Sequence, residues 1–516
     1  MRLLLLLFTF AAFLPAESYS IAGTVVQQTS GAPVRHARVS ITPADGPRQA
    51  TSLFTGNNGQ FSFTGLAAGK YWLAAEFRGH QQLFQEHERF STFVVTGPNL
   101  DSGHIVFALN GAASIDGTVV DEAGDPVADA VVLLFRRAIL SGRTMTVLLN
   151  STPTNEAGEF HPRDLIPGTY FVAVQGKPWF ARYQPRDGSE SQLDVAYPLT
   201  YYSDSISPTD ATPVALTDRA AAAMHLTMHA VPALHIEFEG AKPGENPQLF
   251  QLGPGGMEIP ASRITYFTAG NTVELLGVPP GNYEIQFNGF QGGQLGTSRK
   301  IAVNLTSDTT VNVGQSSKPN ITGTLSLPEG HSPQVPVVLD NIANGQAATS
   351  SVAPDGSFQF DAAAGRYELR LADSELYIKT VAVKGADYAR GELEVRDGSN
   401  IQISITAAKG LSKLAGVATK DGQPFGGAMV LLIPRDFSHG AYIPRDQSDS
   451  DGTFALTAVA PGSYTLLALE DGRELAYHDP AAIAPYLKQG QVIDIPLNTS
   501  QNPGTETKVE VQRQNP

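Results

Sequence analysis

One block of sequence recurs about five times along the 516-residue chain: a polar turn, an aromatic strand and a corner ending in Gly-x-Tyr. The four regular copies read NNGQFSFTGLAAGKY from Asn57, NEAGEFHPRDLIPGTY from Asn155, PDGSFQFDAAAGRY from Pro354 and SDGTFALTAVAPGSY from Ser450. A degraded copy, TVELLGVPPGNY from Thr272, has Val273 where the others have Phe. Self-similarity of this kind indicates tandem copies of one structural unit.

Each part of the block has a stereochemical reason. Asn or Asp before Gly supplies the positive φ that a tight strand-to-strand turn needs. The Phe opens a strand whose alternate side chains, such as Phe61 and Phe63, face a core. In the corner Leu-x-Pro-Gly-x-Tyr, Pro presets φ and Gly takes the left-handed position. We expect the Tyr ring to pack inside while its hydroxyl bonds the backbone of the corner, as in immunoglobulin-like sandwiches.

Further strands flank the block in each copy. An opening strand carrying a Gly begins at Ile21, Ile115, Ile321 and Leu414, and an alternating strand closes each copy from His104, Met224, Thr310, Ile401 and Val492. Short strands separated by frequent turn signals predict an all-β fold, a tandem array of about five Ig-like or prealbumin-like β-sandwich modules. One helix is predicted, over residues 480–490, between a Pro and a Gly.

The repeat predicts the domain boundaries. We expect a signal peptide at 1–20, β-sandwiches at 21–110, 111–230 (with an aromatic insertion), 231–315 (degenerate), 316–408 and 409–498, and a disordered tail at 499–516.

The first residues have the order of a secretory signal peptide. Arg2 precedes an apolar run from Leu3 to Leu14, Pro15 ends it, and small residues follow. We expect cleavage near residues 18 to 20 and a secreted protein, periplasmic or extracellular, with no membrane span in the mature chain; an uncleaved anchor is the alternative.

Composition excludes several functions. The net charge of −15 argues against nucleic-acid partners and anionic membrane surfaces, both of which select basic proteins. The chain has no cysteine, which excludes disulfides, thiolate catalysis and Cys-based zinc sites.

The I-x-G-x-V opening, the G-x-P-V turn, the D/N-x-x-G-x-F turn and the L-x-P-G-x-Y corner together resemble the carboxypeptidase regulatory-like domain family. That family belongs to the transthyretin-like and carbohydrate-binding-like β-sandwiches. The resemblance is good over 21–110, 111–230 and 409–498, fair over 316–408 and poor over 231–315. It implies a secreted bacterial multi-module protein whose domains stabilise, space or present other domains.

The sequence offers little for catalysis. A metallocarboxypeptidase needs a His-x-x-Glu zinc motif, and the nearest match, His161-Pro-Arg-Asp164, falls inside the repeat block. We therefore predict no enzyme and no cofactor.

Two clusters carry side chains of the kinds that bind metal ions. The group His80, Glu86, His87 and Glu88 is interpreted as a solvated loop rather than a zinc site, and Asp446, Asp449 and Asp451 as part of a turn rather than a calcium loop.

The best candidates for ligand binding are aromatic residues inserted in the second module: Trp179, Tyr183, Tyr201 and Tyr202. Exposed planar rings stack on sugar faces, although such rings also pack against a sandwich or a neighbouring module. Two hypotheses follow. The chain is a non-catalytic structural or interaction protein of the cell envelope or extracellular space, or it binds carbohydrate through these aromatics. Its expected partner is accordingly an envelope protein or a polysaccharide.

Overall fold

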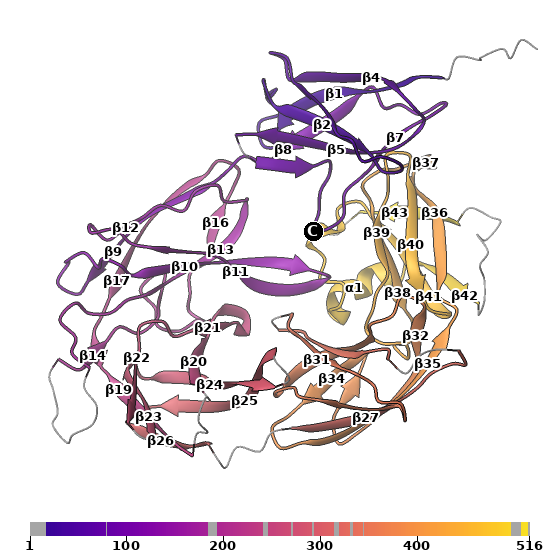
Figure 1. Cartoon of the computed structure of the whole chain (residues 1–516). Helices are drawn as coiled ribbons and strands as arrows, with labels where there is room; N and C mark the ends of the chain where they lie inside the picture. Colours follow the sequence, from indigo (N-terminus) through magenta and orange to yellow (C-terminus); the bar gives the residue numbers. More distant parts are fainter. Residues whose placement is uncertain are drawn as a thin grey trace, which may run out of the picture.

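The computed structural model describes residues 17–78, 80–183, 193–240, 246–269, 272–291, 294–313, 319–330, 334–343, 345–496 and 507–513. The protein is an all-β tandem array, with one short α-helix among these residues (Figure 1). Within the same ranges, no helix has both the length and the apolar character needed to cross a membrane. The predicted signal peptide lies almost entirely outside the described residues.

The strands group into five units, which we call modules 1 to 5. Module 1 contains β1 (Tyr19–Gln27), β2 (Arg38–Pro43), β3 (Thr51–Phe54), β4 (Gln60–Leu66), β5 (Gly69–Phe77), β6 (His80–Leu83), β7 (Val94–Thr96) and β8 (Ile105–Leu109). Module 2 contains β9 (Ser114–Asp121), β10 (Val131–Leu140), β11 (Arg143–Pro153), β12 (Glu159–Phe160), β13 (Gly168–Gln175), β14 (Val195–Ala196), β15 (Thr200–Tyr201), β16 (Val214–Leu216) and β17 (Ala221–Met228).

Module 3 contains β18 (Val231–Pro232), β19 (Leu234–Glu239), β20 (Asn246–Leu252), the 3-10 helix η1 (Pro254–Gly256), β21 (Glu258–Pro260), β22 (Thr265–Ala269), β23 (Thr272–Val278), β24 (Gly281–Gln291), β25 (Gln294–Leu305) and β26 (Thr309–Asn312). Module 4 contains β27 (Asn320–Ser326), β28 (Val337–Asn341), β29 (Ala347–Ser350), β30 (Ser357–Phe360), β31 (Gly365–Leu371), β32 (Leu376–Lys384), β33 (Tyr388–Ala389), β34 (Glu392–Val395) and β35 (Asn400–Lys409).

Module 5 contains β36 (Ser412–Lys420), β37 (Gln423–Pro424), β38 (Met429–Pro434), β39 (Arg445–Gln447), β40 (Thr453–Val459), β41 (Gly462–Leu469), the 3-10 helix η3 (Gly472–Glu474), α1 (Pro480–Leu487), β42 (Gln491–Ile495) and β43 (Thr507–Gln512). The predicted helix is confirmed as α1, and the Asp479 side chain caps its first turn by accepting from Ala481 N.

One topology recurs in all five modules. The opening strand lies between an antiparallel aromatic strand and a parallel closing strand, as β1 lies between β4 and β8. A second sheet packs against this one, and a cluster of buried apolar side chains fills the space between the two sheets. The hydrophobic pattern of the repeat therefore encodes one sandwich per copy.

The opening Gly of the repeat makes room for the repeat Phe. Gly117 lies directly opposite Phe160 in the β9–β12 pair, and a Cβ on Gly117 would lie 2.1 Å from the Phe160 ring. The same pairing joins Gly323 to Phe358, where the corresponding distance is 2.2 Å. These two positions are thus one packing unit, although they lie far apart in the sequence.

Module 3 has exchanged the sizes of this pair. Phe238 occupies the Gly position of the opening strand, and it lies opposite Val273, which occupies the Phe position. Phe238 is fully buried and contacts Phe287 edge-on, with ring centroids 5.7 Å apart. The copy that looks degenerate in sequence therefore keeps the packing of the others, because the large side chain has moved to the neighbouring strand.

The predicted tyrosine corner is confirmed in every module. The hydroxyl of each corner Tyr donates to the backbone carbonyl four residues earlier: Tyr71 to Ala67, Tyr170 to Ile166, Tyr283 to Pro279, Tyr367 to Ala363 and Tyr464 to Ala460. The corner Gly, however, does not adopt the left-handed helical conformation that we expected. In all five modules its φ is positive but larger, between 152° and 159°, a backbone conformation that glycine adopts and that residues with a side chain rarely do.

The chain after Thr499 departs from the expectation of a disordered tail. Thr507–Gln512 form β43, which pairs in parallel with β36 and with the end of β41, and Val509 and Val511 are buried. The alternation of Val with polar residues explains this strand. β43 is the closing strand of module 5, whereas β42, which we expected in that role, pairs with β41 in the second sheet.

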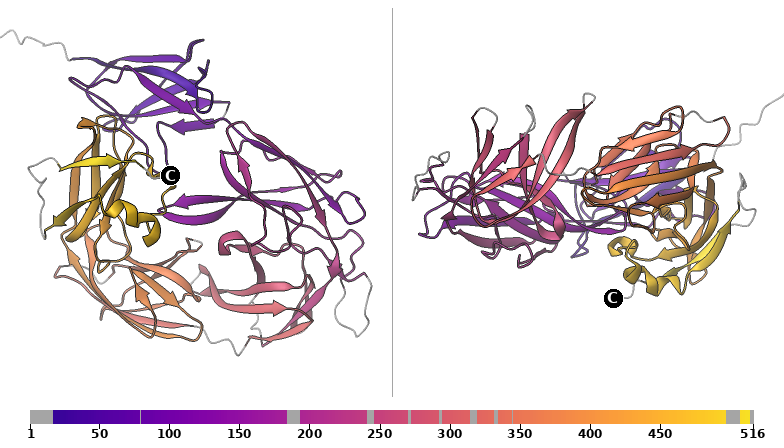
Figure 2. Two further views of the ribbon diagram at one scale, coloured as in Figure 1. Left: turned by 180° about the vertical axis from the view of Figure 1, so that it is seen from behind. Right: turned by 90° about the horizontal axis from the view of Figure 1, so that it is seen from below.

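The five modules form a ring rather than an extended string (Figure 1). Module 5 lies against module 1, and the β10–β11 hairpin of module 2 points across the middle of the ring toward α1; the view from behind in Figure 2 shows the same arrangement. This closure brings together residues that are several hundred positions apart in the sequence.

Candidate functional site at the centre of the module ring

A seam joins module 1 to module 5. The backbone N–H of Phe93 donates to Asp449 Oδ1 at 3.2 Å, and Ser450 N donates back to the Phe93 carbonyl at 3.0 Å. The ammonium of Lys70 also contacts the Asp449 carboxylate, which is almost fully buried. Val95 N donates to Ser450 Oγ at 2.8 Å, so the seam combines backbone pairing with a half-buried ion pair.

The side chain of Gln447 extends the seam. Its Nε2 donates to the Gln85 carbonyl at 2.6 Å and to Thr92 Oγ1 at 2.9 Å. Gln447 is buried, and a buried amide without hydrogen-bond partners would destabilise the fold. These two hydrogen bonds supply the partners that its amide needs.

The tip of the β10–β11 hairpin forms a hub at the ring centre. Ser141 and Gly142 both have positive φ, which gives the tight turn that such a hairpin needs. Arg143 follows the turn and contacts Glu368 and Glu392 of module 4, with Nη2 2.8 Å from Glu392 Oε1. These two carboxylates lie directly opposite each other on β31 and β34, so Arg143 neutralises a like-charge pair.

Module 5 completes the hub. His478 N donates to the Gly142 carbonyl at 3.0 Å, and Nη2 of Arg143 lies 3.1 Å from His478 Nδ1. Burial, reinforced by the positive charge of Arg143, lowers the pKa of His478 to about 3. His478 is therefore neutral at neutral pH, and its Nδ1 accepts a hydrogen bond from Arg143.

A second buried cation ties module 1 to module 5. The side chain of Arg445 is only 4% exposed, lies 3.4 Å from Glu88 and stacks over the Phe90 ring at 4.5 Å. Neighbouring His87 is half-buried, and burial followed by the charges of Arg445, Arg473 and Arg136 lowers its pKa to about 4.

The joint between modules 2 and 3 is also ionic. His235 of β19 lies between two carboxylates, with Nε2 2.7 Å from Asp194 and Nδ1 2.9 Å from Glu274. Burial opposes a charge on His235, but the two carboxylates outweigh it and raise its pKa.

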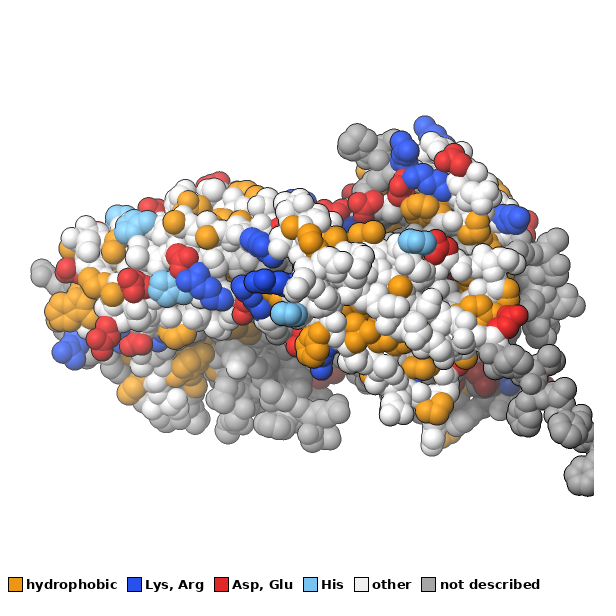
Figure 3. Space-filling view, turned by 90° about the horizontal axis from the view of Figure 1, so that it is seen from above, with side chains coloured by type: hydrophobic (Ala, Val, Ile, Leu, Met, Phe, Trp, Pro, Cys, Tyr) orange, Lys and Arg blue, Asp and Glu red, His pale blue; other side chains and the backbone are white. Residues whose placement is uncertain are grey.

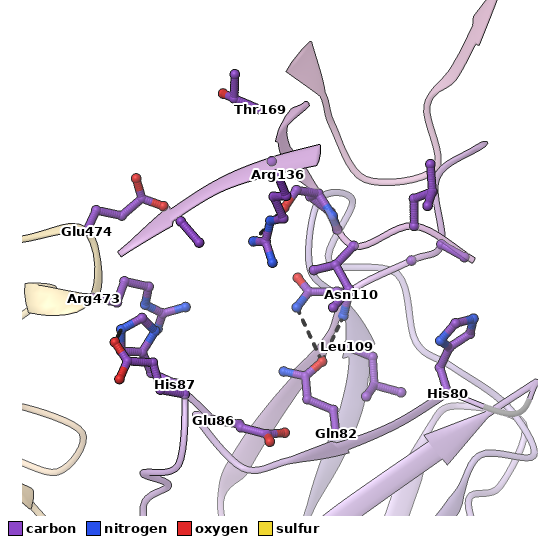
Figure 4. A pocket seen from close by; sticks show the side chains of 18 of the residues that line it. His80, Gln82, Glu86, His87, Leu109, Asn110, Arg136, Thr169, Arg473 and Glu474 are labelled. Atoms are coloured by element: carbon purple, nitrogen blue, oxygen red, sulfur yellow. Dashed lines mark hydrogen bonds and ion pairs between the residues drawn. The ribbon is translucent and has the colours of Figure 1, made fainter. Parts of the chain in front are cut away.

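A cleft of about 1610 Å³ opens between modules 1, 2 and 5 (Figure 4). Its lining includes six arginines: Arg35, Arg78, Arg136, Arg137, Arg219 and Arg473. Figure 4 shows Arg136 and Arg473 extending toward the open space from opposite walls, with Asn110 and Gln82 hydrogen-bonded beside them. In the view from above, Lys and Arg side chains gather near the middle of the face (Figure 3).

The four predicted sugar-binding aromatics do not form one platform. Tyr201 is fully buried in a cluster that also includes Ile259 of module 3, so its ring is not accessible for stacking. Tyr183 packs against Gly277 of module 3 and Tyr202 packs against the core of module 2. Only Trp179, which is 85% exposed, is largely open to solvent among the four.

The two clusters of metal-ligating side chains, for which we predicted no metal, make other contacts. Asp449 belongs to the seam, Asp451 caps its own turn by accepting from Thr453 N, and Asp446 accepts from Ala455 N. In the other cluster, which contains His80 and Glu86 as well, His87 and Glu88 are largely buried beside the hub. This corrects our interpretation of a solvated loop, because module 5 covers these two residues.

His80, Glu86 and the His161 of the zinc-like motif also make contacts within or between modules. His80 lies 3.1 Å from Asp164 of module 2, and Glu86 accepts from the backbone N–H of Leu83. His161 of the nearest zinc-like motif pairs with Asp116 at 2.8 Å on the surface of module 2.

The seam and hub residues were not identified from the sequence. One signal was present: β10 and β11 have 10 and 11 residues, whereas β2 and β38, which occupy the place of β10 in modules 1 and 5, have six. A hairpin that extends beyond the other strands of its sandwich indicates that its tip contacts another module.

Residues 20–92 match the model of the carboxypeptidase regulatory-like domain family, which supports the resemblance for module 1. No curated protein matches the chain. Among solved structures, a minor pilin of Streptococcus agalactiae is 14% identical, covering 43% of this chain and 99% of its own, with a TM-score of 0.22. The shaft pilin SpaA of Lactobacillus rhamnosus GG is 9% identical, covering 44% and 100%, with a TM-score of 0.21. At such scores these pilins give no basis for assigning a function or an arrangement of modules.

Proposed function

We propose that this chain is an exported, non-catalytic structural or interaction protein of the cell envelope or extracellular space, whose five sandwiches close into a ring of fixed geometry. The seam between modules 1 and 5 carries the proposal. A linear spacer does not require contacts between its first and last modules. In a closed ring such contacts fix the positions of the five modules, and hence of their outer surfaces, relative to one another.

The chemistry of the repeat supports a structural role. The repeated Gly, Phe and Tyr form packing pairs and corners, so the recurrent positions are explained by folding. The central charged groups, Arg143 and Arg445, pair with carboxylates of neighbouring modules, which uses their charge to hold modules together.

Small-angle X-ray scattering of the full chain tests the ring. A closed ring has a smaller maximum dimension than five sandwiches end to end, and its scattering profile should match the structure. Replacing Asp449 and Ser450 with Ala should open the seam and lengthen the particle, whereas Asp45→Ala, an exposed change outside the seam, should not. An extended particle for the wild type would refute the ring.

Export is tested separately. Expression with the first 20 residues in a Gram-negative host should yield a shortened mature protein outside the cytoplasm, and deletion of Leu3 to Leu14 should retain it inside. A full-length protein retained in the membrane would favour the uncleaved anchor.

Sugar binding by module 2 now rests on Trp179 alone, paired edge-on with Phe180 at 5.6 Å. A single exposed indole is a smaller platform than the four rings that the sequence suggested. A polysaccharide pull-down comparing wild type with Trp179→Ala tests this alternative, and equal binding by both would refute it.

A further inference from the structure

The cleft between modules 1, 2 and 5 reverses the charge balance of the chain. The whole protein has 35 Lys and Arg against 50 Asp and Glu, yet the cleft is lined by six arginines against five carboxylates. An excess of cations in one cavity of an acidic protein attracts anions by focusing the field between low-dielectric walls.

The carboxylates of the cleft already have partners. Glu88 lies against Arg445 and accepts from Ser141 N, and Asp164 pairs with His80. Glu86 accepts from Leu83 N, and Asp479 caps α1. Four of the five carboxylates therefore keep their charge but direct oxygens to other protein groups, and among the described residues none of the five forms an ion pair with an arginine of the cleft lining.

The arginines are in the opposite condition. Among the described residues, Arg35, Arg78, Arg136, Arg137 and Arg219 make no ion pair, and Arg473 alone pairs, with Asp471 at 2.9 Å. The Nε of Arg136 is buried and has no hydrogen-bond partner there, although its Nη2 donates to the Pro167 carbonyl at 3.2 Å. A buried donor without an acceptor is costly, and the Arg136 guanidinium also carries a charge that no carboxylate among the described residues contacts as an ion pair.

The positive charge acts on a neighbouring group as well. His87 lines the same cleft, and after burial the charges that depress its pKa are those of Arg445, Arg473 and Arg136. Two of these three arginines belong to the cleft wall, so cations from module 2 and module 5 act on the same point.

We infer that this cleft binds a multivalent oligoanion: a small molecule or short oligomer carrying at least two carboxylate, sulfate or phosphate groups. Arginine guanidinium groups suit such groups because their planar donors match two oxygens at once. The volume of about 1610 Å³ exceeds the usual range for a compact drug-sized ligand, so an extended ligand suits it better. The inference goes beyond a structural role, and it rests on the closed ring, since three modules build the cleft.

Calorimetric titration of the full chain tests it with three anionic probes and one neutral probe. The anions are tripolyphosphate, trigalacturonate and a sulfated disaccharide, which distinguish phosphate, carboxylate and sulfate, and maltotriose is the neutral probe. We expect one molecule of at least one anion to bind per chain, and binding to weaken as salt is raised to about 150 mM. Maltotriose should not bind.

Three variants locate the site. Exposed Arg137 and Arg219 are replaced together by Gln, and half-buried Arg136 by Gln in a separate variant, so that a folding defect in one leaves the other informative. Each should weaken binding by about tenfold or more, the loss expected for charge-assisted hydrogen bonds. The matched control is Arg48→Gln, an exposed arginine outside the cleft, which should leave affinity unchanged.

Three results would overturn the inference: no binding of any anion, binding of maltotriose as tight as that of the anions, or equal losses in Arg48→Gln and the cleft variants. Scattering data on the same samples separate this failure from failure of the ring. A closed particle that binds no anion refutes the cleft inference alone, whereas an extended particle refutes the ring.

Discussion

Phe238 lies opposite Val273 in module 3, at the position where Gly117 lies opposite Phe160 in module 2. The two pairs fill the same space with the large side chain on opposite strands. We therefore expect Gly117→Phe alone to destabilise module 2 by about 3 kcal/mol or more, because the new ring overlaps that of Phe160. Adding Phe160→Val should recover part of this loss.

Thermal or denaturant unfolding of the three variants measures this compensation. The control is Phe160→Val alone, which should cost about 1–3 kcal/mol through the cavity that it leaves. A double variant no more stable than Gly117→Phe would show that the exchange in module 3 depends on other residues of that module.

The hub should depend on a single guanidinium. Arg143→Met leaves Glu368 and Glu392 opposite each other without their shared cation, and we expect a loss of about 3 kcal/mol in the stability of the central contacts. The control is Arg366→Met, since Arg366 also pairs with Glu392 but is 64% exposed and should contribute less than about 1 kcal/mol. Equal effects in thermal unfolding would contradict a special role for the hairpin tip.

Acid should weaken the hub. His478 and His87 have folded-state pKa values of about 3 and 4, below the ordinary value of 6.5. Below pH 6.5 these histidines are protonated in the unfolded chain but still neutral in the folded chain. Their effect on the free energy of unfolding is therefore absent above pH 6.5, and that free energy falls as the pH drops toward 4. The slope is about 1.4 kcal/mol per pH unit for each histidine. The free energy of unfolding can be measured by urea titration at successive pH values. In His478→Gln its slope against pH should fall by the contribution of one proton, and an unchanged slope would contradict the lowered pKa of His478. Burial raises the pKa of Asp446 and Asp449, which opposes the trend, so the difference between variant and wild type is the informative quantity.

The joint between modules 2 and 3 should respond to pH in the opposite sense. The pKa of His235 is raised, so its charge stabilises the joint fully below pH 6.5, and this contribution is lost as the pH rises through the raised pKa. Proton exchange or ring-proton NMR of His235 should show titration above that of a free histidine. Glu274→Gln should lower that titration point, and a His235 that titrates at its ordinary pKa would refute the charged joint.

Two aromatics of module 2 should behave differently on truncation. Tyr201→Ala removes a fully buried ring and should cost about 3–5 kcal/mol, whereas Trp179→Ala changes an exposed side chain and should lie within about 0.5 kcal/mol of wild type. Chemical denaturation measures both. A large loss for Trp179→Ala would mean that this side chain packs against a surface that the structure leaves open.

The repeat was sufficient to predict the sandwiches, because the Gly–Phe packing pair and the tyrosine corner are each formed inside a single copy. The strand β43 was predictable in principle from its alternation of Val with polar residues, but the polar surroundings hid it. The ring was not predictable in this way. Gln447 and Arg143 lie outside the repeated pattern, whereas Asp449 occupies the first position of the D/N-x-x-G-x-F turn. The contacts of all three between modules depend on how whole modules are oriented, which no local periodicity encodes.

A closed ring also changes what a single backbone cut can achieve. In a linear string, cleavage of one linker releases everything beyond it. Here the seam between Phe93 and Asp449 holds the two fragments together after one cut, and only a second cut would separate them. For the exported protein that we propose, ring closure would therefore keep the chain assembled after a protease has cut any one joint between modules.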